Sequence, residues 1–107
     1  MNCRVLLLVG AATLIEGAAV QPSIAQDQAK IAAGAKTFSE YCSTCHGDDL
    51  INSGLTFDLR RLKAGERPRF ENSVLNGKNQ MPPWRGVLNE DQIDKLWNYI
   101  RANAFEK

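Results

Sequence analysis

Five consecutive residues, Cys42-Ser43-Thr44-Cys45-His46, hold two of the three cysteines and the only histidine of this 107-residue chain. On a helical turn, two cysteines three positions apart point to one side, and the next residue lies about 100° further round. Both thiols and one imidazole can therefore reach a single group from one turn of backbone. A chain of this length makes one domain, so the whole fold has to be arranged around that turn.

The N-terminal segment has the layout of a secretory signal peptide. Arg4 precedes an apolar stretch over residues 5–20, and the small residues Ser23 and Ala25 occupy the −3 and −1 positions of a cut after Ala25. A membrane anchor is the alternative, but a span needs about 20 unbroken apolar residues, and Glu16 interrupts this run. We therefore expect residues 1–25 to be a signal peptide and the rest to form a domain without a membrane span.

The domain expected after cleavage, residues 26–107, keeps two cysteines, one histidine and one methionine. So small a domain usually needs a disulfide, a metal or another staple to be stable. Zinc would need a second pair of ligands, and a thioredoxin-like dithiol would need a βαβ context. An ordinary disulfide would leave His46 and Met81 without a role. Cys-x-x-Cys-His is the attachment pattern of haem c, so the sequence favours one covalent haem on Cys42 and Cys45.

The iron of such a haem has two axial positions, and His46 fills only one of them. Met81 lies in NQMPPW, residues 79–84, where prolines stiffen the backbone just after it. A lone methionine often fills gaps in an apolar core, and this role is the alternative. As a ligand, the soft and neutral thioether would favour Fe(II) and raise the reduction potential. With both positions filled, the site suits outer-sphere electron transfer and offers no easy place for a substrate or O₂.

Apolar spacing predicts an all-α fold. A helix is expected over residues 31–41, because apolar side chains there recur every three or four positions. Residues 26–30 precede it as a polar lead-in. Glycines and prolines interrupt residues 47–83, so a loop-rich middle with one short helix over 67–75 is expected.

The last helix has the clearest pattern. Asn89 is a good N-cap, and Gln92 three positions later completes a pair that resembles a capping box. An apolar stripe follows at helical spacing. It consists of Ile93, Leu96, Trp97 and Ile100.

The net charge of +1 favours neither a nucleic-acid partner nor a membrane partner. The charge is uneven, however, because residues 60–85 contain seven basic and two acidic side chains. This segment is either a solvated loop region or a positive docking face for a redox partner around the haem edge.

Three motifs resemble, in this order, the signatures of class I cytochromes c: GAKTFSEYCSTCHG, NQMPPW and LNEDQIDKLWNYIR. The resemblance covers nearly all of residues 26–107. It implies the cytochrome c fold, in which the N- and C-terminal helices cross and the middle wraps one haem. The residues implied at the crossing are Gly34, Phe38, Leu96, Tyr99 and Ile100.

The resemblance also implies a ligand set. Cys42 and Cys45 would form the thioethers, and His46 and Met81 would be the axial ligands, so both would bind the metal.

One departure from the family concerns the support of His46. Many members place a proline about ten residues after the histidine, and its carbonyl holds the imidazole N–H. Residues 53–57 contain no proline. Another backbone carbonyl, with Leu55 and Thr56 as candidates, is then expected to fix the tautomer.

Within the family, TFDLRRL, MPPWRGVL and LWNYIR look most similar to small periplasmic cytochromes that accept electrons from quinoprotein (PQQ-dependent) alcohol dehydrogenases. The resemblance implies a non-enzymatic periplasmic carrier, with such a dehydrogenase as donor and an oxidase or another cytochrome as acceptor. A haem enzyme is an alternative, but it would need a distal acid–base residue, and no second histidine is present. A gas-binding haem sensor of the four-helix type is another alternative. Its CxxCH motif lies near the C-terminus, however, whereas here the motif lies near the start of residues 26–107.

Overall fold

The computed structural model describes residues 7–14, 17 and 22–107. Within those residues every regular element is helical, which confirms the all-α expectation. The α-helices are α1 (Pro22–Tyr41), α2 (Ser43–His46), α3 (Arg67–Asn76) and α4 (Glu90–Ala102). Three single turns of 3-10 helix lie between them: η1 (Asp48–Leu50), η2 (Leu59–Arg61) and η3 (Ala64–Glu66).

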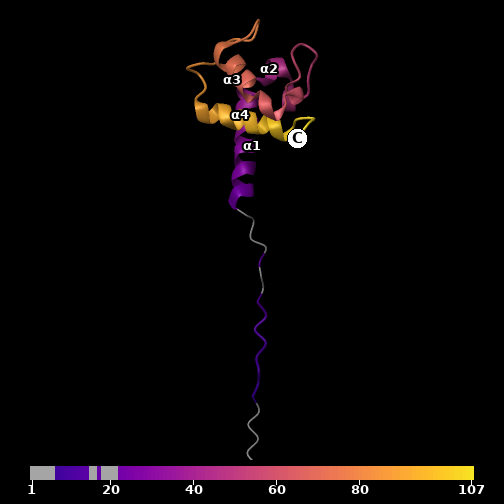
Figure 1. The fold of residues 1–107 in the computed structure, drawn as a ribbon, viewed down its shortest axis with the longest axis vertical. Helices are drawn as coiled ribbons and strands as arrows, with labels where there is room; N and C mark the ends of the chain where they lie inside the picture. Colours follow the sequence, from indigo (N-terminus) through magenta and orange to yellow (C-terminus); the bar gives the residue numbers. More distant parts are fainter. Residues whose placement is uncertain (1–6, 15–16, 18–21) are drawn as a thin grey trace, which may run out of the picture.

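Helices α1 and α4 cross and pack against each other, on the side of the body from which α1 projects (Figure 1). The rings of Phe38 and Tyr99 pack with their centroids 5.5 Å apart. At Gly34 a side-chain carbon would lie only 2.6 Å from the carbonyl carbon of Lys95. Only glycine permits so close an approach of two helices, so the expected crossing and the role of Gly34 in it are confirmed.

Helix α4 begins and buries its stripe as the sequence predicts. The side chain of Asn89 accepts a hydrogen bond from the backbone N–H of Gln92 at 2.8 Å, and the Gln92 side chain accepts one from the Asn89 N–H at 3.0 Å. This reciprocal pair satisfies two donors at the start of the helix. The buried side chains of α4 are Ile93, Leu96, Trp97, Tyr99 and Ile100.

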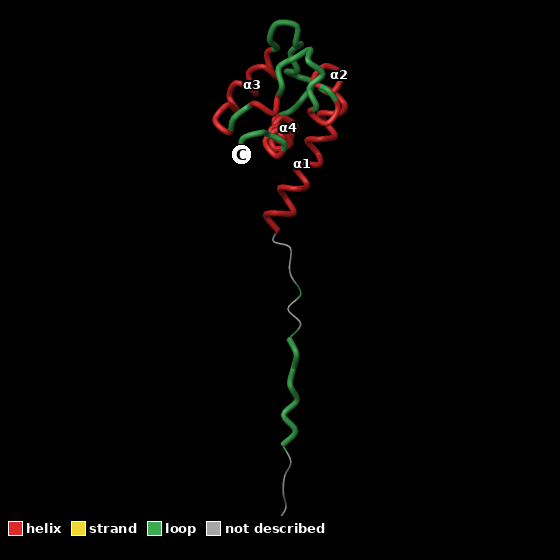
Figure 2. The backbone as a smooth tube through the Cα atoms, turned by 90° about the vertical axis from the view of Figure 1, so that its right-hand side faces the viewer, coloured by secondary structure: helices red, strands yellow, loops and turns green. Residues whose placement is uncertain are grey.

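Helix α1 starts earlier than expected, at Pro22 and not at residue 31. Proline is favoured in the first helical position, and alanine, glutamine and lysine in the next turns are good helix formers. Residues 23–30 bury no side chain, which explains why apolar spacing did not reveal them. Figure 2 shows this part of α1 projecting from the body. The expected cut after Ala25 falls in its first turn, and the expected leader lies partly outside the described residues, at 1–6, 15–16 and 18–21.

The middle of the chain is loop-rich, and α3 matches the short helix expected over 67–75 to within one residue. Phe70 of α3 packs on Trp97 of α4, with ring centroids 5.3 Å apart. The remaining loops gather at the end of the body away from the start of α1 (Figure 2). In the part of the chain described, no helix combines the length and the apolar character needed to cross a bilayer.

Candidate functional site

The turn that carries the two cysteines and the histidine continues directly from α1. The backbone N–H of Cys42 donates to the Phe38 carbonyl at 2.8 Å, so this residue still belongs to the hydrogen-bond ladder of α1. The N–H groups of His46 and Cys45 then donate to the Cys42 carbonyl at 2.9 Å and 3.3 Å. The structure thus brings Cys42, Cys45 and His46 together on one rigid turn at the end of α1.

The two thiols are free, Cys42 half-buried and Cys45 exposed. Burial, with a smaller contribution from neighbouring Cys45, raises the pKa of the Cys42 thiol to about 11. Dithiols that act in disulfide exchange depend on a lowered pKa. This environment therefore speaks against the thioredoxin-like alternative.

His46 is half-buried, and its Nδ1 lies 3.1 Å from the hydroxyl oxygen of Thr56. Burial lowers the pKa of the imidazole, and the backbone of Phe57 partly opposes that shift. The ring is therefore held neutral at neutral pH, which is the form that binds metals.

The side-chain partner of His46 is the Thr56 hydroxyl, whereas the sequence led us to expect a backbone carbonyl of Leu55 or Thr56. The backbone of Phe57 also interacts with the imidazole. In the turn of residues 52–56, the side-chain amide of Asn52 donates to the Thr56 carbonyl at 2.9 Å. This bond holds the turn that presents the hydroxyl to the imidazole.

Met81 lies on a tight turn that is fastened to α3. Its backbone N–H and carbonyl pair with Lys78 at 2.9 Å and 3.1 Å. At Gly77 a side-chain carbon would lie 2.6 Å from the Met81 carbonyl oxygen, and the positive φ of 74° also requires glycine. The N–H of Trp84 donates to the Val74 carbonyl of α3 at 2.8 Å. Met81 is therefore positioned by backbone anchors on both sides and not by a helix face.

The Met81 turn meets the end of α1 through two aromatic rings. Tyr41 and Trp84 pack edge to face, with centroids 5.4 Å apart. Tyr41 immediately precedes Cys42, and Trp84 closes the Met81 turn. All four candidate residues are thus carried by segments that meet at one end of the molecule.

Several apolar side chains near the two turns are incompletely buried. Half-buried apolar side chains pack on the edge of the core here, among them Cys42, Met81 and Trp84. In the segment next to His46, Ile51 and Leu55 are 65% and 83% exposed. Bare apolar side chains of this size cost stability, and a porphyrin held by the neighbouring turn would cover such surface. Although Cys42, Cys45 and His46 share one turn, no three His, Cys, Asp or Glu side chains of the described residues are arranged so that they could hold a metal ion by themselves, as a zinc site would require.

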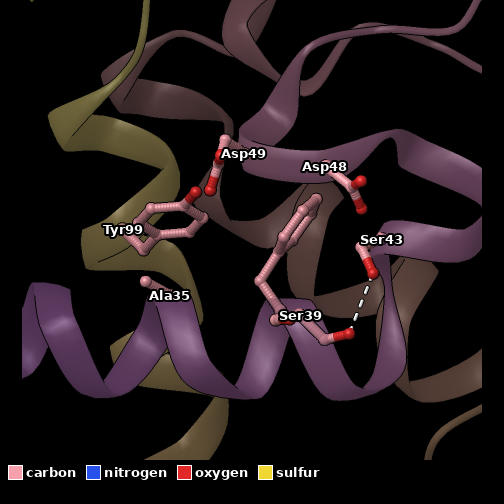
Figure 3. A pocket seen from close by; sticks show the side chains of 7 residues that line it. Ala35, Ser39, Ser43, Asp48, Asp49 and Tyr99 are labelled. Carbon is pink, nitrogen blue, oxygen red and sulfur yellow. Dashed lines mark hydrogen bonds between the residues drawn. The ribbon is translucent and has the colours of Figure 1, made fainter.

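A pocket of about 330 Å³ lies near the start of α2 but contains none of the four candidate residues. Figure 3 shows Tyr99 and Asp49 on one side of it and Ser39 and Ser43 on the other. The hydroxyl of Ser43 donates to the Ser39 carbonyl at 2.8 Å. Burial, and then the charge of Asp49, raises the pKa of Tyr99. The pocket is a separate polar hollow beside the helix crossing.

A crossing of terminal helices, with a Cys-x-x-Cys-His turn at the end of the first, defines a small haem protein. Residues 29–100 match the protein family described as cytochrome c oxidase, cbb3-type, subunit III. Cytochrome c6 of Euglena gracilis is 35% identical over 78 residues, which cover 66% of this chain and 90% of that protein. Cytochrome c6 of Nostoc sp. is 34% identical, over 92% of this chain and 90% of that protein.

A second group of relatives is larger. Quinohemoprotein alcohol dehydrogenase ADH-IIG of Pseudomonas putida is 31% identical over 79% of this chain, which spans only 12% of the dehydrogenase. The solved structure of that enzyme matches with a TM-score of 0.68 and 32% identity, over 73% of this chain and 12% of the other. The chain belongs to the cytochrome c family. As a member it binds haem c covalently and serves as a haem-based electron carrier.

Proposed function

We propose that the protein is an exported, non-enzymatic electron carrier with a single His/Met-ligated haem c. Cys42 and Cys45 form the thioethers in this proposal, and His46 and Met81 are the axial ligands. The observation that carries it is the meeting of the Cys42–His46 turn with the Met81 turn through Tyr41 and Trp84. When bound, the haem supplies one-electron chemistry between Fe(III) and Fe(II).

The residues of the chain have distinct tasks in this proposal. The two cysteines hold the porphyrin on the end of α1, and His46 presents a neutral imidazole from the same turn. Met81 offers a thioether from a turn fixed on α3. The T-shaped contact between Tyr41 and Trp84 holds the two turns together. With both axial positions taken, the site would pass electrons without binding a substrate.

The export signal of residues 1–25, a periplasmic location and a mature domain of residues 26–107 are part of the same proposal. The similarity to the Nostoc protein supports it, because a match over 92% of this chain extends into the segment expected to be the leader. The residues of this leader whose burial the structure describes, 7–14, 17 and 23–25, are all exposed, so a cut after Ala25 would remove none of them from the core. N-terminal sequencing of the protein from the periplasmic fraction tests this part, and an uncleaved N-terminus would contradict it.

A quinoprotein alcohol dehydrogenase is the proposed donor, and a terminal oxidase or another cytochrome is the proposed acceptor in a respiratory chain. The likeness to a short stretch of ADH-IIG supports the donor, because that enzyme contains a segment similar to this whole domain. This chain spans only 12% of that enzyme, so the dehydrogenase activity in its name is not proposed for this chain.

We propose that the basic segment of residues 60–85 docks the redox partner, but ion pairs neutralise part of its positive charge. Arg60 pairs with Asp58, and Arg69 pairs with Glu66. Arg67 binds both Glu71 and Asp94. The basic residues of this segment that form no ion pair within the described chain are Arg61, Lys63, Lys78 and Arg85.

Two experiments test the carrier function. The visible spectrum of the oxidised holoprotein should be low-spin and show the weak methionine–iron band, whereas a high-spin, CO-avid protein would indicate the alternative haem enzyme or sensor. The transfer rate from a quinoprotein dehydrogenase should fall as salt shortens the Debye length from about 30 Å at 0.01 M to about 8 Å at 0.15 M. The double variant Arg61→Gln/Lys63→Gln should flatten that dependence, and Arg67→Gln is the matched control.

A further inference from the structure

The side chain of Thr56 contacts both Cys45 and His46. Its hydroxyl oxygen is 3.2 Å from the Cys45 carbonyl oxygen and 3.1 Å from Nδ1 of His46. The residue is half-buried, and the Asn52 amide fixes its backbone by binding its carbonyl at 2.9 Å. The hydroxyl therefore has two polar contacts, and the backbone that carries it is held by a third.

A threonine hydroxyl has one hydrogen to donate and two lone pairs, so it can donate to only one of its two neighbours. The Cys45 carbonyl can only accept, whereas Nδ1 of His46 donates or accepts according to the tautomer. Both contacts are hydrogen bonds only when the Thr56 hydrogen points to the Cys45 carbonyl and Nδ1 carries the proton. In that arrangement Nε2 is left without a proton and is free to bind a metal.

We propose that Thr56 is the positioning residue that fixes the Nδ1–H tautomer of His46 and strengthens Nε2 as an iron ligand. This inference rests on the proposed function, in which His46 binds the haem iron. The hydroxyl acts beside the backbone of Phe57, which also interacts with the imidazole. Because its hydrogen is donated onward to the Cys45 carbonyl, the chain of two bonds polarises the oxygen as an acceptor.

The proposal has a consequence for the reduction potential. An acceptor that binds the Nδ1 proton makes Nε2 of the same ring more basic. A more basic nitrogen ligand favours Fe(III) over Fe(II). Removing the acceptor should therefore raise the midpoint potential. Mutating a hydrogen-bond partner of a metal-bound histidine typically costs about 10–100-fold in metal affinity or activity. A tenfold change in the preference between the two oxidation states corresponds to a shift of about 59 mV for one electron.

Three variants of the holoprotein test the effect in a redox titration. Thr56→Val keeps the shape but removes the hydroxyl, and its midpoint should rise by an amount equivalent to about tenfold. Thr56→Ser keeps the hydroxyl and should stay near the wild-type value. Ser53→Ala is the matched control, because Ser53 is exposed in the same loop and forms no side-chain hydrogen bond among the described residues. A Thr56→Val midpoint equal to the wild type, with an intact spectrum, would overturn the proposal.

A measurement on the wild type keeps the inference testable if Thr56→Val fails to take up haem. In the reduced protein labelled with ¹⁵N, Nδ1 of His46 should carry a proton that exchanges slowly with water. An Nδ1 without a proton would overturn the assignment. A different result would show that the proposed function itself is wrong. If His46 were not an iron ligand, His46→Ala would retain haem with an unchanged spectrum, whatever residue occupies position 56.

Discussion

Replacing Gly34 with alanine tests whether the helix crossing limits the stability of this domain. The added carbon would lie 2.6 Å from the carbonyl carbon of Lys95 and 2.8 Å from Cβ of Tyr99, and it would also overlap the Lys95 carbonyl oxygen. Carbon atoms pack best at about 3.5–4.0 Å. Since the obstacle is mainly backbone, no side chain can swing aside, and α1 and α4 must separate by roughly 1 Å.

The expected cost follows from two opposing effects. Overpacking a well-packed core typically costs about 1–3 kcal/mol, and the backbone obstacle points to the upper end or beyond. Alanine returns up to about 1 kcal/mol through its higher helix propensity. The net loss of about 2 kcal/mol is large against a typical total stability of about 5–15 kcal/mol. For a domain of this size it lowers the melting temperature by roughly 8–16 °C.

Thermal unfolding of the holoprotein, followed by circular dichroism, measures this effect. Gly65→Ala is the matched control, because a side chain at Gly65 would meet nothing within 4 Å. That variant should remain within about 0.5 kcal/mol of the wild type. A Gly34→Ala protein that melts together with the Gly65→Ala control would refute the argument that the close approach of the helices requires glycine.

Three further substitutions address the ligands and the start of α4. His46→Ala should prevent a stable holoprotein, because so small a domain has too little core without its haem; haem staining after denaturing electrophoresis shows the loss, and a normal yield of low-spin protein would remove His46 as a ligand. Met81→His should keep the haem and lower the midpoint potential, because imidazole stabilises Fe(III) more than a thioether does; an unchanged titration would mean that Met81 is not on the iron. Asn89→Ala should cost about 0.5–2 kcal/mol in urea unfolding, while Asn89→Ser should retain most of the stability.

The sequence was a good guide wherever a pattern was local. Helix α4 was predictable because its cap at Asn89 and its buried stripe lie within one short segment. The crossing at Gly34 was implied by the family resemblance, and the contact with Tyr99 confirms it. The first turns of α1 escaped prediction because the side chains of residues 23–30 are exposed, and apolar spacing detects only helices with a buried face.

The environment of His46 could be predicted only in part. The missing proline showed that a different group must support the ring, and it directed attention to residues 53–57. Which group does so depends on the conformation of the turn, in which the Asn52 side chain binds the Thr56 carbonyl and the Thr56 hydroxyl reaches Nδ1 of His46. No spacing rule describes that conformation. The same holds for the basic segment, because Arg67 meets its partner Asp94 only after α3 has packed near α4.

The backbone hydrogen bonds of the two turns also indicate which axial ligand a change at the helix crossing would displace. Through the bond from Cys42 to Phe38, the Cys-x-x-Cys-His turn moves with α1, and Thr56 follows because it binds His46 and Cys45. Met81 is instead tied to α3. Separation of α1 from α4 in Gly34→Ala should therefore weaken the contact between Tyr41 and Trp84, which joins the Met81 turn to α1. The contacts of Thr56 with His46 should stay intact. The methionine–iron band should weaken in that variant while the Nδ1 proton of His46 stays protected from exchange, and the opposite result would show that the turn does not move with α1.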